Sequence, residues 1–463
     1  MPLEFPASVP FEPTVHQEFL SAIQGNILKP HGRMQVRLVF FAGLSTREQA
    51  RALLAEALRS GRVTSAWQQR EQADLRKAGG GQAFFYGVML TKEFFWATAS
   101  ADFPPEGTDA FRTGAYSRAA DPSKWDQPYR QHPQGLWLVA HDETDQLKDE
   151  VARVEKMLRK HGAKILRRPR PASGAAPDPK PGTEAGFRWH DAGERDAMRE
   201  PFGFRDGLSD SAFLQPQPAA PRHVQIGLAQ LLIGDGAHAG GSFFVLQKLD
   251  QNVAAFRRFE GEIAKKFTAL GRPLPAREAG ALLVGRERDG QPLVDGVAAG
   301  SNAFDFDGDA TAARCPFHAH IRKANPRTTT LPNEGLLERQ FARRSAIYDE
   351  RGQLPAHAAP DYPEGAAIAG DVGLLFMGYM RDVQSQFEHM RRTWFEDDNF
   401  PFANSTPDPV LVGAGAAGGG EWRWNQAGVA VPGLSSFVRN RGTLFGYAPS
   451  ILWLRRFAAE TAP

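Results

Sequence analysis

Short apolar segments with the character of β-strands alternate along this chain with segments of helical composition. Apolar residues recur at every second position at Val36, Leu38 and Phe40, which predicts a half-buried strand. Two further short strands are indicated by the apolar runs at residues 84–90 and 136–140. This alternation of short elements limits the folds that the chain can adopt.

Two segments beside these strands are rich in Ala, Leu, Glu and Arg, which favour helix, and they cover residues 47–58 and 147–160. A doubly wound parallel sheet needs many crossovers of uniform length, and the chain has too few of them. We therefore expect an α+β fold with antiparallel sheets and peripheral helices.

The length of the chain predicts two domains. With 463 residues, of which 42% are hydrophobic, it can bury a large core but exceeds what one core usually supports. The Pro-rich segment at residues 215–221 is the predicted boundary. We expect an N-terminal domain over residues 1–215 and a C-terminal domain over residues 222–463.

The second half of the chain again combines predicted strands with predicted helices. A buried strand is predicted at residues 242–246, and apolar residues at helical spacing predict helices at residues 253–267 and 380–394. Segments rich in Gly, Ala or Pro at residues 167–182 and 413–420 are predicted to be surface loops.

The charge and the cysteine content limit which partners and which cellular compartment are expected for this protein. Lys and Arg number 55 against 53 Asp and Glu, and the basic residues are scattered, so we expect a small-molecule partner and neither nucleic acid nor a membrane surface. Cys315 is the single cysteine, which fits a reducing compartment. The first residues lack a signal-peptide pattern and no apolar span reaches 18 residues, so a cytoplasmic location is expected.

Two histidines lie beside three cations in the run at residues 315–327 (CPFHAHIRKANPR). On a strand, His318 and His320 would share one face, but no second group of His, Cys or carboxylate residues accompanies them at zinc-like spacing. A structural zinc site is therefore not expected. A heme needs only one protein ligand to iron, together with cations for its propionates, and this run offers both.

One carboxylate, Asp206, lies in a Gly-flanked turn at residues 203–207 (GFRDG), where the backbone can approach a flat ligand closely. Such pentapeptides occur in many turns, so the motif alone is weak. Its flanks strengthen it, since the longer run EPFGFRDGLS and the segment AHIRKANPR together resemble the dye-decolorizing peroxidase family. Further matches extend this resemblance over nearly the whole chain, and they occur at residues 23–29, 241–245 and 441–450.

The resemblance is closest to the longer branch of the family, which includes the fungal enzymes. It implies two ferredoxin-like domains of the dimeric α+β barrel type and one heme b per chain. It also implies a peroxidase that uses hydrogen peroxide to oxidise small or bulky organic donors, such as dyes and phenolics, by one-electron steps. A monomer and a dimer are both compatible with it.

The resemblance also assigns the proximal side of the heme. His320 is the iron ligand, and Asp408 accepts the other ring N–H of the histidine, with Glu388 as the reserve carboxylate. Arg322 and Arg327 are expected to pair with the heme propionates.

On the distal side, Asp206 is expected to move a proton between the two peroxide oxygens, while an arginine stabilises the departing oxygen. Arg343 is the preferred arginine, although Ile347 stands where the family usually has Pro, so Arg344 stays open. The remaining residues assigned to the heme-binding surface are Phe204, Gly207, Leu375 and Phe376.

Bulky donors cannot reach a buried iron, so Trp394 and Tyr348 are candidates for electron transfer at the surface, with core packing as the alternative. A non-catalytic heme-binding or heme-delivery protein is the alternative function. Asp206 and Arg343 argue against it, because burying charge without need costs several kcal/mol. A cofactor-free domain that binds other molecules through its surface is a second alternative.

Overall fold

The computed structural model describes most of the chain. The described residues are 3, 5, 15–81, 83–105, 109–166, 183–187, 199–208, 226–329, 331, 335–351, 368–413 and 420–459. The predicted boundary at 215–221 and the predicted loop at 167–182 lie outside them, as do residues 414–419 of the second predicted loop.

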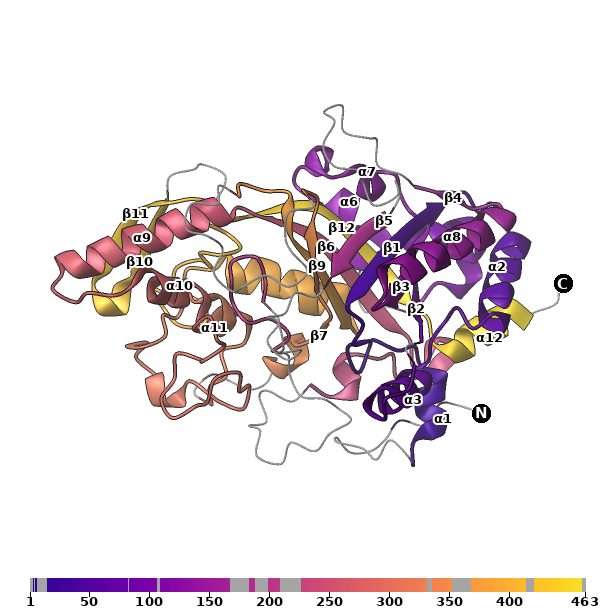
Figure 1. The fold of residues 1–463 in the computed structure, drawn as a ribbon, viewed down its shortest axis with the longest axis horizontal. Coiled ribbons are helices and arrows are strands. Elements are labelled where there is room, and N and C mark those ends of the chain that lie inside the picture. Colours follow the sequence, from indigo (N-terminus) through magenta and orange to yellow (C-terminus); the bar gives the residue numbers. More distant parts are fainter. Residues whose placement is uncertain are drawn as a thin grey trace.

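Ten strands form one antiparallel sheet, in the order β3-β2-β12-β6-β9-β8-β5-β1-β4, with β7 beside β9. Because β1 also pairs with β3 over seven residues, the path from β3 to β1 closes on itself as a barrel (Figure 1). The predicted α+β fold with ferredoxin-like antiparallel sheets is confirmed. The strands are β1 (Gln35–Ala42), β2 (Phe85–Leu90), β3 (Gly135–His141), β4 (Lys164–Ile165), β5 (Thr183–Phe187), β6 (Ser242–Gln251), β7 (Ala342–Arg343), β8 (Ala346–Asp349), β9 (Val372–Met380) and β12 (Val438–Ala448).

Two narrow seams join the strands of the first half of the chain to those of the second. Tyr447 of β12 pairs with Leu90 of β2, and Phe187 of β5 pairs with Ile347 of β8, each as a single residue pair. Within the second half, by contrast, β6 pairs with both β12 and β9 over most of its length. The barrel thus consists of two half-sheets, and the division at residues 215–222 stays a prediction.

The helices pack on the barrel or on one another through their apolar faces. The helix α8 (Thr144–Lys160) packs its buried residues against β1 and β3, and α2 (Arg47–Arg59) begins at a capping box formed by Thr46 and Gln49. The last helix, α12 (Ile451–Ala459), packs against α2 and so lies with the first half (Figure 1). The other α-helices are α1 (Gln17–Ala22), α3 (Ala66–Lys77), α4 (Lys92–Thr98), α5 (Ala110–Thr113), α6 (Ala115–Arg118), α7 (Gln127–Arg130), α9 (Val253–Ala269), α10 (Ala276–Val284) and α11 (His320–Ala324).

The helix predicted at residues 380–394 takes a different form. Met380 ends strand β9, and two π-helical segments follow it, η8 (Val383–Glu388) and η9 (Met390–Phe395). The side chain of Asp382 accepts the N–H of Ser385 at 2.6 Å, which caps the first turn and sets the start of η8. A small separate sheet pairs β10 (Gly420–Trp424) with β11 (Val429–Leu434) beside α9.

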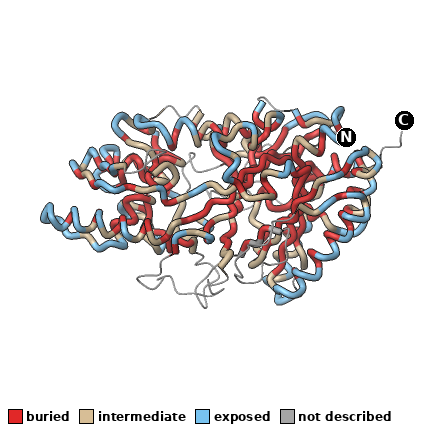
Figure 2. Tube along the Cα trace, turned by 90° about the horizontal axis from the view of Figure 1, so that it is seen from above, coloured by how far each residue is buried: buried red, intermediate tan, exposed pale blue. Residues whose placement is uncertain are grey.

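The two faces of β6 have different neighbours. Gln247 and Leu249 line a cavity outside the barrel. The side chain of Lys248, which points the other way, is fully buried and reaches Glu184 on β5. Buried residues concentrate along the strands, and exposed residues lie at the edges of the molecule (Figure 2). Of the helices that the structure describes, none is long and apolar enough to cross a membrane.

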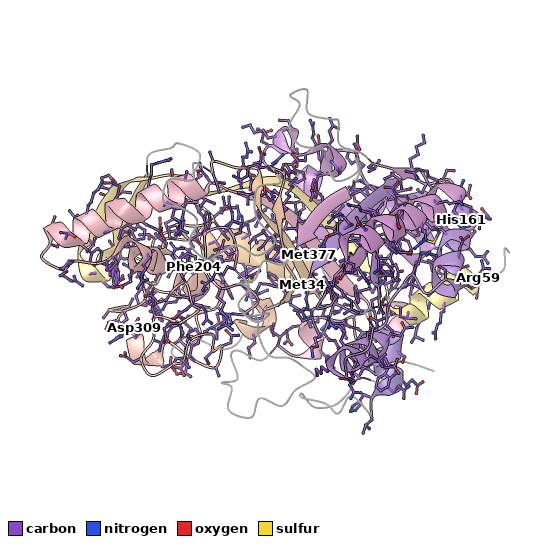
Figure 3. The ribbon with its side chains drawn as sticks, in the orientation of Figure 1. Met34, Arg59, His161, Phe204, Asp309 and Met377 are labelled. Atoms are coloured by element: carbon purple, nitrogen blue, oxygen red, sulfur yellow. The ribbon has the colours of Figure 1, made fainter. Side chains whose placement is uncertain are left out.

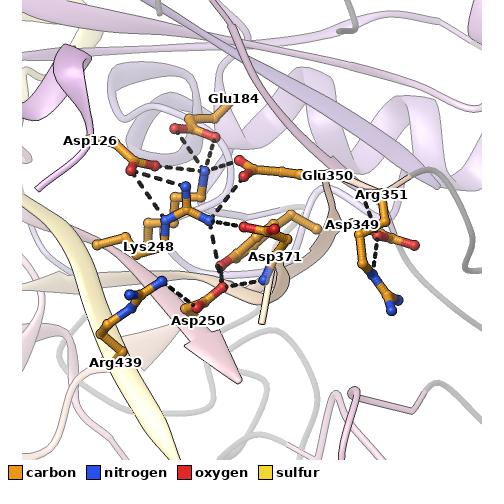
Figure 4. Close-up of polar contacts among 11 residues, drawn as sticks. Asp126, Glu184, Lys248, Asp250, Asp349, Glu350, Arg351, Asp371 and Arg439 are labelled. Carbon is orange, nitrogen blue, oxygen red and sulfur yellow. Dashed lines mark hydrogen bonds and ion pairs between the residues drawn. The ribbon is translucent and has the colours of Figure 1, made fainter. Parts of the chain in front are cut away.

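An ion network surrounds the buried side chain of Lys248 (Figure 4). The ammonium group of Lys248 lies 3.0 Å from Asp126 and 3.2 Å from Glu184, and it also contacts Glu350. Arg441 of β12 lies 3.1 Å from Asp126 and 3.0 Å from Glu350. Because Asp126 and Glu184 belong to the first half of the chain and the others to the second, the network ties the two half-sheets together.

Candidate active site

A cavity of about 340 Å³ lies against the outer face of β6 and β9. Its other walls come from the turn at residues 204–208, from α10 and α11, and from η9. Phe204 lies on the side of the sheet where α10 and α11 are found, far from Arg59 and His161 (Figure 3). A cavity of this size, whose surface is mostly apolar but which polar side chains also line, is typical of a cofactor or small-molecule site.

On one side of the cavity, His320 is held by a buried carboxylate. Its Nδ1 donates to Oδ2 of Asp408 at 2.7 Å, and Asp408 is fully buried, with Oδ1 accepting the N–H groups of Val410 at 2.8 Å and Leu411 at 3.0 Å. Burial alone would raise the pKa of Asp408, but the neighbouring His320 and these hydrogen bonds hold it below its usual value. The pair fixes the tautomer of the histidine and leaves Nε2 with its lone pair available to a metal ion.

His318 has quite different surroundings. It is buried outside the cavity lining, and burial lowers its pKa to about 3. Its ring lies edge-on to Trp422, with the ring centres 5.4 Å apart. The two histidines do not share a strand face, because the chain enters α11 at His320.

Arg322 lies away from the cavity. Its guanidinium donates to Oδ2 of Asp309 at 2.9 Å and to the carbonyl of Cys315 at 2.6 Å, and it is packed between the rings of Phe306 and Phe317. This placement corrects the propionate role expected of Arg322. Its partner Asp309 is 13 residues away along the chain, and no local motif indicates that pairing.

Arg327 does line the cavity. Both of its terminal nitrogens donate to Asn302, at 2.7 Å each, and Arg286 donates to the same side-chain oxygen of Asn302 at 3.0 Å. The ring of Phe304 lies beneath both guanidinium groups. Sequence reasoning missed Arg286, because nothing in its own segment distinguishes it from a surface cation.

The turn that carries Asp206 forms another wall. Gly203 and Gly207 have φ of 92° and 77°, which non-glycine residues rarely adopt, and the N–H of Gly207 donates to Oδ1 of Asp206 at 2.7 Å. Phe204, Asp206 and Gly207 all reach the cavity. Arg343 of β7 lines it as well, and its Nη2 donates a long hydrogen bond of 3.5 Å to the carbonyl of Leu208.

The structure separates Arg343 from Arg344 by their partners. Arg344 is buried, and its guanidinium donates at 2.7 Å to three carbonyls, those of Asn26, Ile27 and Arg343. Arg344 reaches the cavity wall, but its donors serve the backbone. Arg343 is therefore the better candidate for a cation that acts on a bound molecule.

Of the two residues of β9 that the sequence predicted at the cavity wall, only one lies there. Phe376 lines the cavity, and so does Leu374, which sequence reasoning missed. Leu375 points into the barrel, where it is fully buried beside Gly186 of β5. The reason is the pleat of the strand, which sends successive side chains to opposite faces.

The two aromatic residues expected at the surface are both buried. Tyr348 is 1% exposed and its hydroxyl donates to Oδ1 of Asp250 at 3.0 Å, while Trp394 is 4% exposed and stacks on Phe400 with ring centres 4.7 Å apart. This corrects the surface electron-transfer role in favour of core packing. Glu388, the reserve carboxylate, is bound by Arg118 at 2.7 Å rather than by His320.

Comparison with known proteins identifies relatives of this chain. The family model described as "Dyp-type peroxidase, C-terminal" matches residues 197–401. The chain is 32% identical to the "Multifunctional dye peroxidase DyP2" of Amycolatopsis sp. over 94% of this chain and 95% of the relative. It is 27% identical to the "Dye-decolorizing peroxidase msp1" of Mycetinis scorodonius over 69% of this chain and 65% of the relative.

Solved structures show the same fold. The structure of DyP2 from Amycolatopsis sp. superimposes with a TM-score of 0.76 at 28% identity and covers 94% of this chain and 96% of its own. A DyP-type peroxidase from Anabaena sp. superimposes with a TM-score of 0.79 at 24% identity and covers 98% of each chain.

Proposed function

Because this chain belongs to the dye-decolorizing peroxidase family and is a heme-dependent peroxidase, we propose that the cavity beside His320 is its active site. The enzyme uses hydrogen peroxide to oxidise organic donors, including dyes and phenolics. Its cofactor is heme.

The residues around the cavity fit a heme. The walls are largely apolar, as a porphyrin ring requires, and His320 offers a ring nitrogen whose partner nitrogen is already bound to Asp408. Arg286 and Arg327 place two guanidinium groups on the lining, and these would pair with propionates. The bound heme supplies the redox-active iron that reduces peroxide.

On the proximal side, His320 would hold the iron through Nε2. The carboxylate of Asp408 orients the ring and, through the hydrogen bond from Nδ1, makes the imidazole a stronger donor to the metal. A stronger donor favours cleavage of the peroxide O–O bond.

On the distal side, Asp206 would accept a proton from one peroxide oxygen and return it to the other, which leaves as water. Arg343 would stabilise the negative charge that develops on the departing oxygen. Asp206 suits the proton transfer because it lies on a glycine-flanked turn at the cavity and is partly exposed, and its Oδ1 accepts the N–H of Gly207.

The observation that carries this proposal is the short bond between His320 and Asp408 at the wall of a cavity that Asp206 and Arg343 also line. The test is the ultraviolet–visible spectrum of the heme-loaded protein before and after one equivalent of peroxide. We expect an intense Soret band that peroxide changes and an organic donor restores. A Soret band that peroxide leaves unchanged would instead indicate a heme carrier.

A further inference from the structure

The turn that carries Asp206 is folded around the side chain of Glu200. Oε2 of Glu200 accepts the backbone N–H of Phe202 and Oε1 accepts that of Phe204, both at 2.9 Å. Backbone bonds close the same turn, since the N–H of Gly203 donates to the Glu200 carbonyl at 2.7 Å. Without the carboxylate, the two inward N–H groups would lack an acceptor, which is costly for buried backbone.

A third donor links the carboxylate to the barrel. The side-chain amide of Gln251, at the end of β6, donates to Oε2 of Glu200 at 2.8 Å. All three contacts are N–H donors, and a carboxylate accepts all of them. Glu200 therefore connects the Asp206 turn to the strand that forms the cavity wall.

Arg288 also stabilises this turn, through different contacts. Its carbonyl accepts the N–H of Arg205 at 3.0 Å, and its guanidinium donates to the Phe202 carbonyl and to Glu260. Neither Arg288 nor Glu260 is part of the cavity lining, whereas Glu200 is. Of these three side chains, therefore, Glu200 is the one that both supports the turn and lines the cavity.

The pKa of Glu200 is perturbed as well. Burial raises its pKa to about 7, against the effect of the hydrogen bonds from Gln251, Phe202 and Phe204, and the nearby charge of Asp206 raises it further. A carboxyl with a perturbed pKa at a cavity wall is more typical of a functional group than of a structural one.

We propose that Glu200 is a positioning residue of the peroxidase reaction, whose carboxylate sets the conformation of residues 202–206 and so holds Asp206 at the cavity. The inference rests on the proposed role of Asp206 as proton carrier. A proton is transferred across heavy-atom distances of about 2.6–3.2 Å, directly or through one water molecule, so a displacement of about 1 Å slows the step on the order of 100-fold.

The first test is Glu200→Gln in the heme-loaded enzyme. Glutamine keeps the size of the side chain but replaces one acceptor oxygen with an amide that faces a backbone N–H. We expect unchanged heme content and an unchanged KM for the organic donor, but a rate of oxidation by peroxide that is about 10 to 100 times lower. Hydrogen exchange should accelerate at the amides of Phe202 and Phe204 and stay as in the wild type along β6 and β9.

A double-mutant cycle with Asp206→Asn separates positioning from general damage. If Glu200 acts through Asp206, the double variant is as slow as Asp206→Asn alone. Rate losses that multiply would overturn the inference, as would a wild-type rate in Glu200→Gln when Asp206→Asn is slow. A wild-type rate in Asp206→Asn would instead refute the proposed function.

Two further variants complete the test. Gln251→Leu removes only the third donor, so we expect a rate loss of about fivefold that disappears in the Asp206→Asn background. This variant decides the matter if Glu200→Gln fails to fold, and an unchanged rate would count against the inference. Glu262→Gln is the control, because Glu262 is exposed on α9 and pairs with Lys265, and it should match the wild type in every measurement.

Discussion

His318 and His320 are separated by a single residue in the chain, yet their side chains have different surroundings. His320 is bound to Asp408 at the cavity wall, and His318 packs against Trp422 in the core. Only the first of these positions leaves a ring nitrogen for a metal that enters the cavity.

His320→Ala should therefore lose heme or hold it loosely, since it removes the axial ligand together with its oriented carboxylate partner. His318→Ala should keep a normal Soret spectrum, with some loss of thermal stability from the cavity it creates. Spectra and heme content of the two purified variants check this. Normal ligation in His320→Ala, or equal heme loss in both variants, would contradict the assignment.

Arg343→Leu should bind heme normally yet react with peroxide about 10² to 10³ times more slowly, because it removes a preorganised donor to the departing oxygen. Arg344→Leu should retain most of that rate and lose stability instead, since its guanidinium serves three backbone carbonyls. Stopped-flow rates and melting temperatures compare the two. The reverse result would place the catalytic cation one residue further along the chain.

At this scale the motifs indicated residues that the structure brings close together, but they did not indicate where every side chain points. Asp206 and His320 line one cavity and Asp408 binds His320 from behind, although 88 residues separate His320 from Asp408. The resemblance misplaced Leu375, because a strand motif does not say which face meets the ligand. It also missed the bond between Arg322 and Asp309, which only the folded chain creates.

Among the elements, β12 and α12 together enclose a histidine. His238 is 5% exposed, its Nδ1 lies 3.0 Å from the hydroxyl of Tyr447, and its ring stacks on Trp453 of α12. Burial lowers the pKa of His238 to about 4, and the charge of Arg456 lowers it further. The folded protein thus keeps this ring neutral in mild acid.

A pH dependence of stability follows. In the unfolded chain, His238 takes up a proton below its ordinary pKa of about 6.5, and in the folded protein it does so only near pH 4, so acid favours the unfolded state. The free energy of unfolding should fall by about 3 kcal/mol from this residue between pH 7 and pH 4. Denaturant titrations of wild type and His238→Asn at several pH values measure it, and parallel curves for the two proteins would exclude this source.

The regular elements were predictable because local pattern and tertiary packing agree. The strands β1, β2 and β3 and the helix α8 form where alternation and composition indicate. The form of the region that contains η8 and η9 could not be predicted, because apolar spacing does not distinguish an α-helix from a π-helix. In addition, β9 extends to Met380, where the helix was expected to begin. The resemblance implied a barrel, but the strand pairs that close it could not be read from the sequence, since a single pair such as Phe187 with Ile347 leaves no sequence pattern.

In the whole molecule, Lys248 holds the two half-sheets together from inside the barrel. Lys248→Met should destabilise the protein by about 3–5 kcal/mol, because it removes the buried cation beside Glu184 and one of the two cations beside Asp126 and Glu350. Lys265→Met, which breaks an exposed pair on α9, should change stability by about 0.5 kcal/mol or less. Chemical denaturation of both variants compares them, and equal stability would show that the network contributes little.

The position of α12 has a consequence for the order in which the protein is made. The face of α2 on which α12 packs, and the β2 edge that meets Tyr447, are built from residues synthesised early, but they are covered by residues 447–459. A nascent chain therefore carries an uncovered helix face and an open strand edge until residues 447–459 have left the ribosome. The first half of the molecule is completed only when residues 451–459 have emerged.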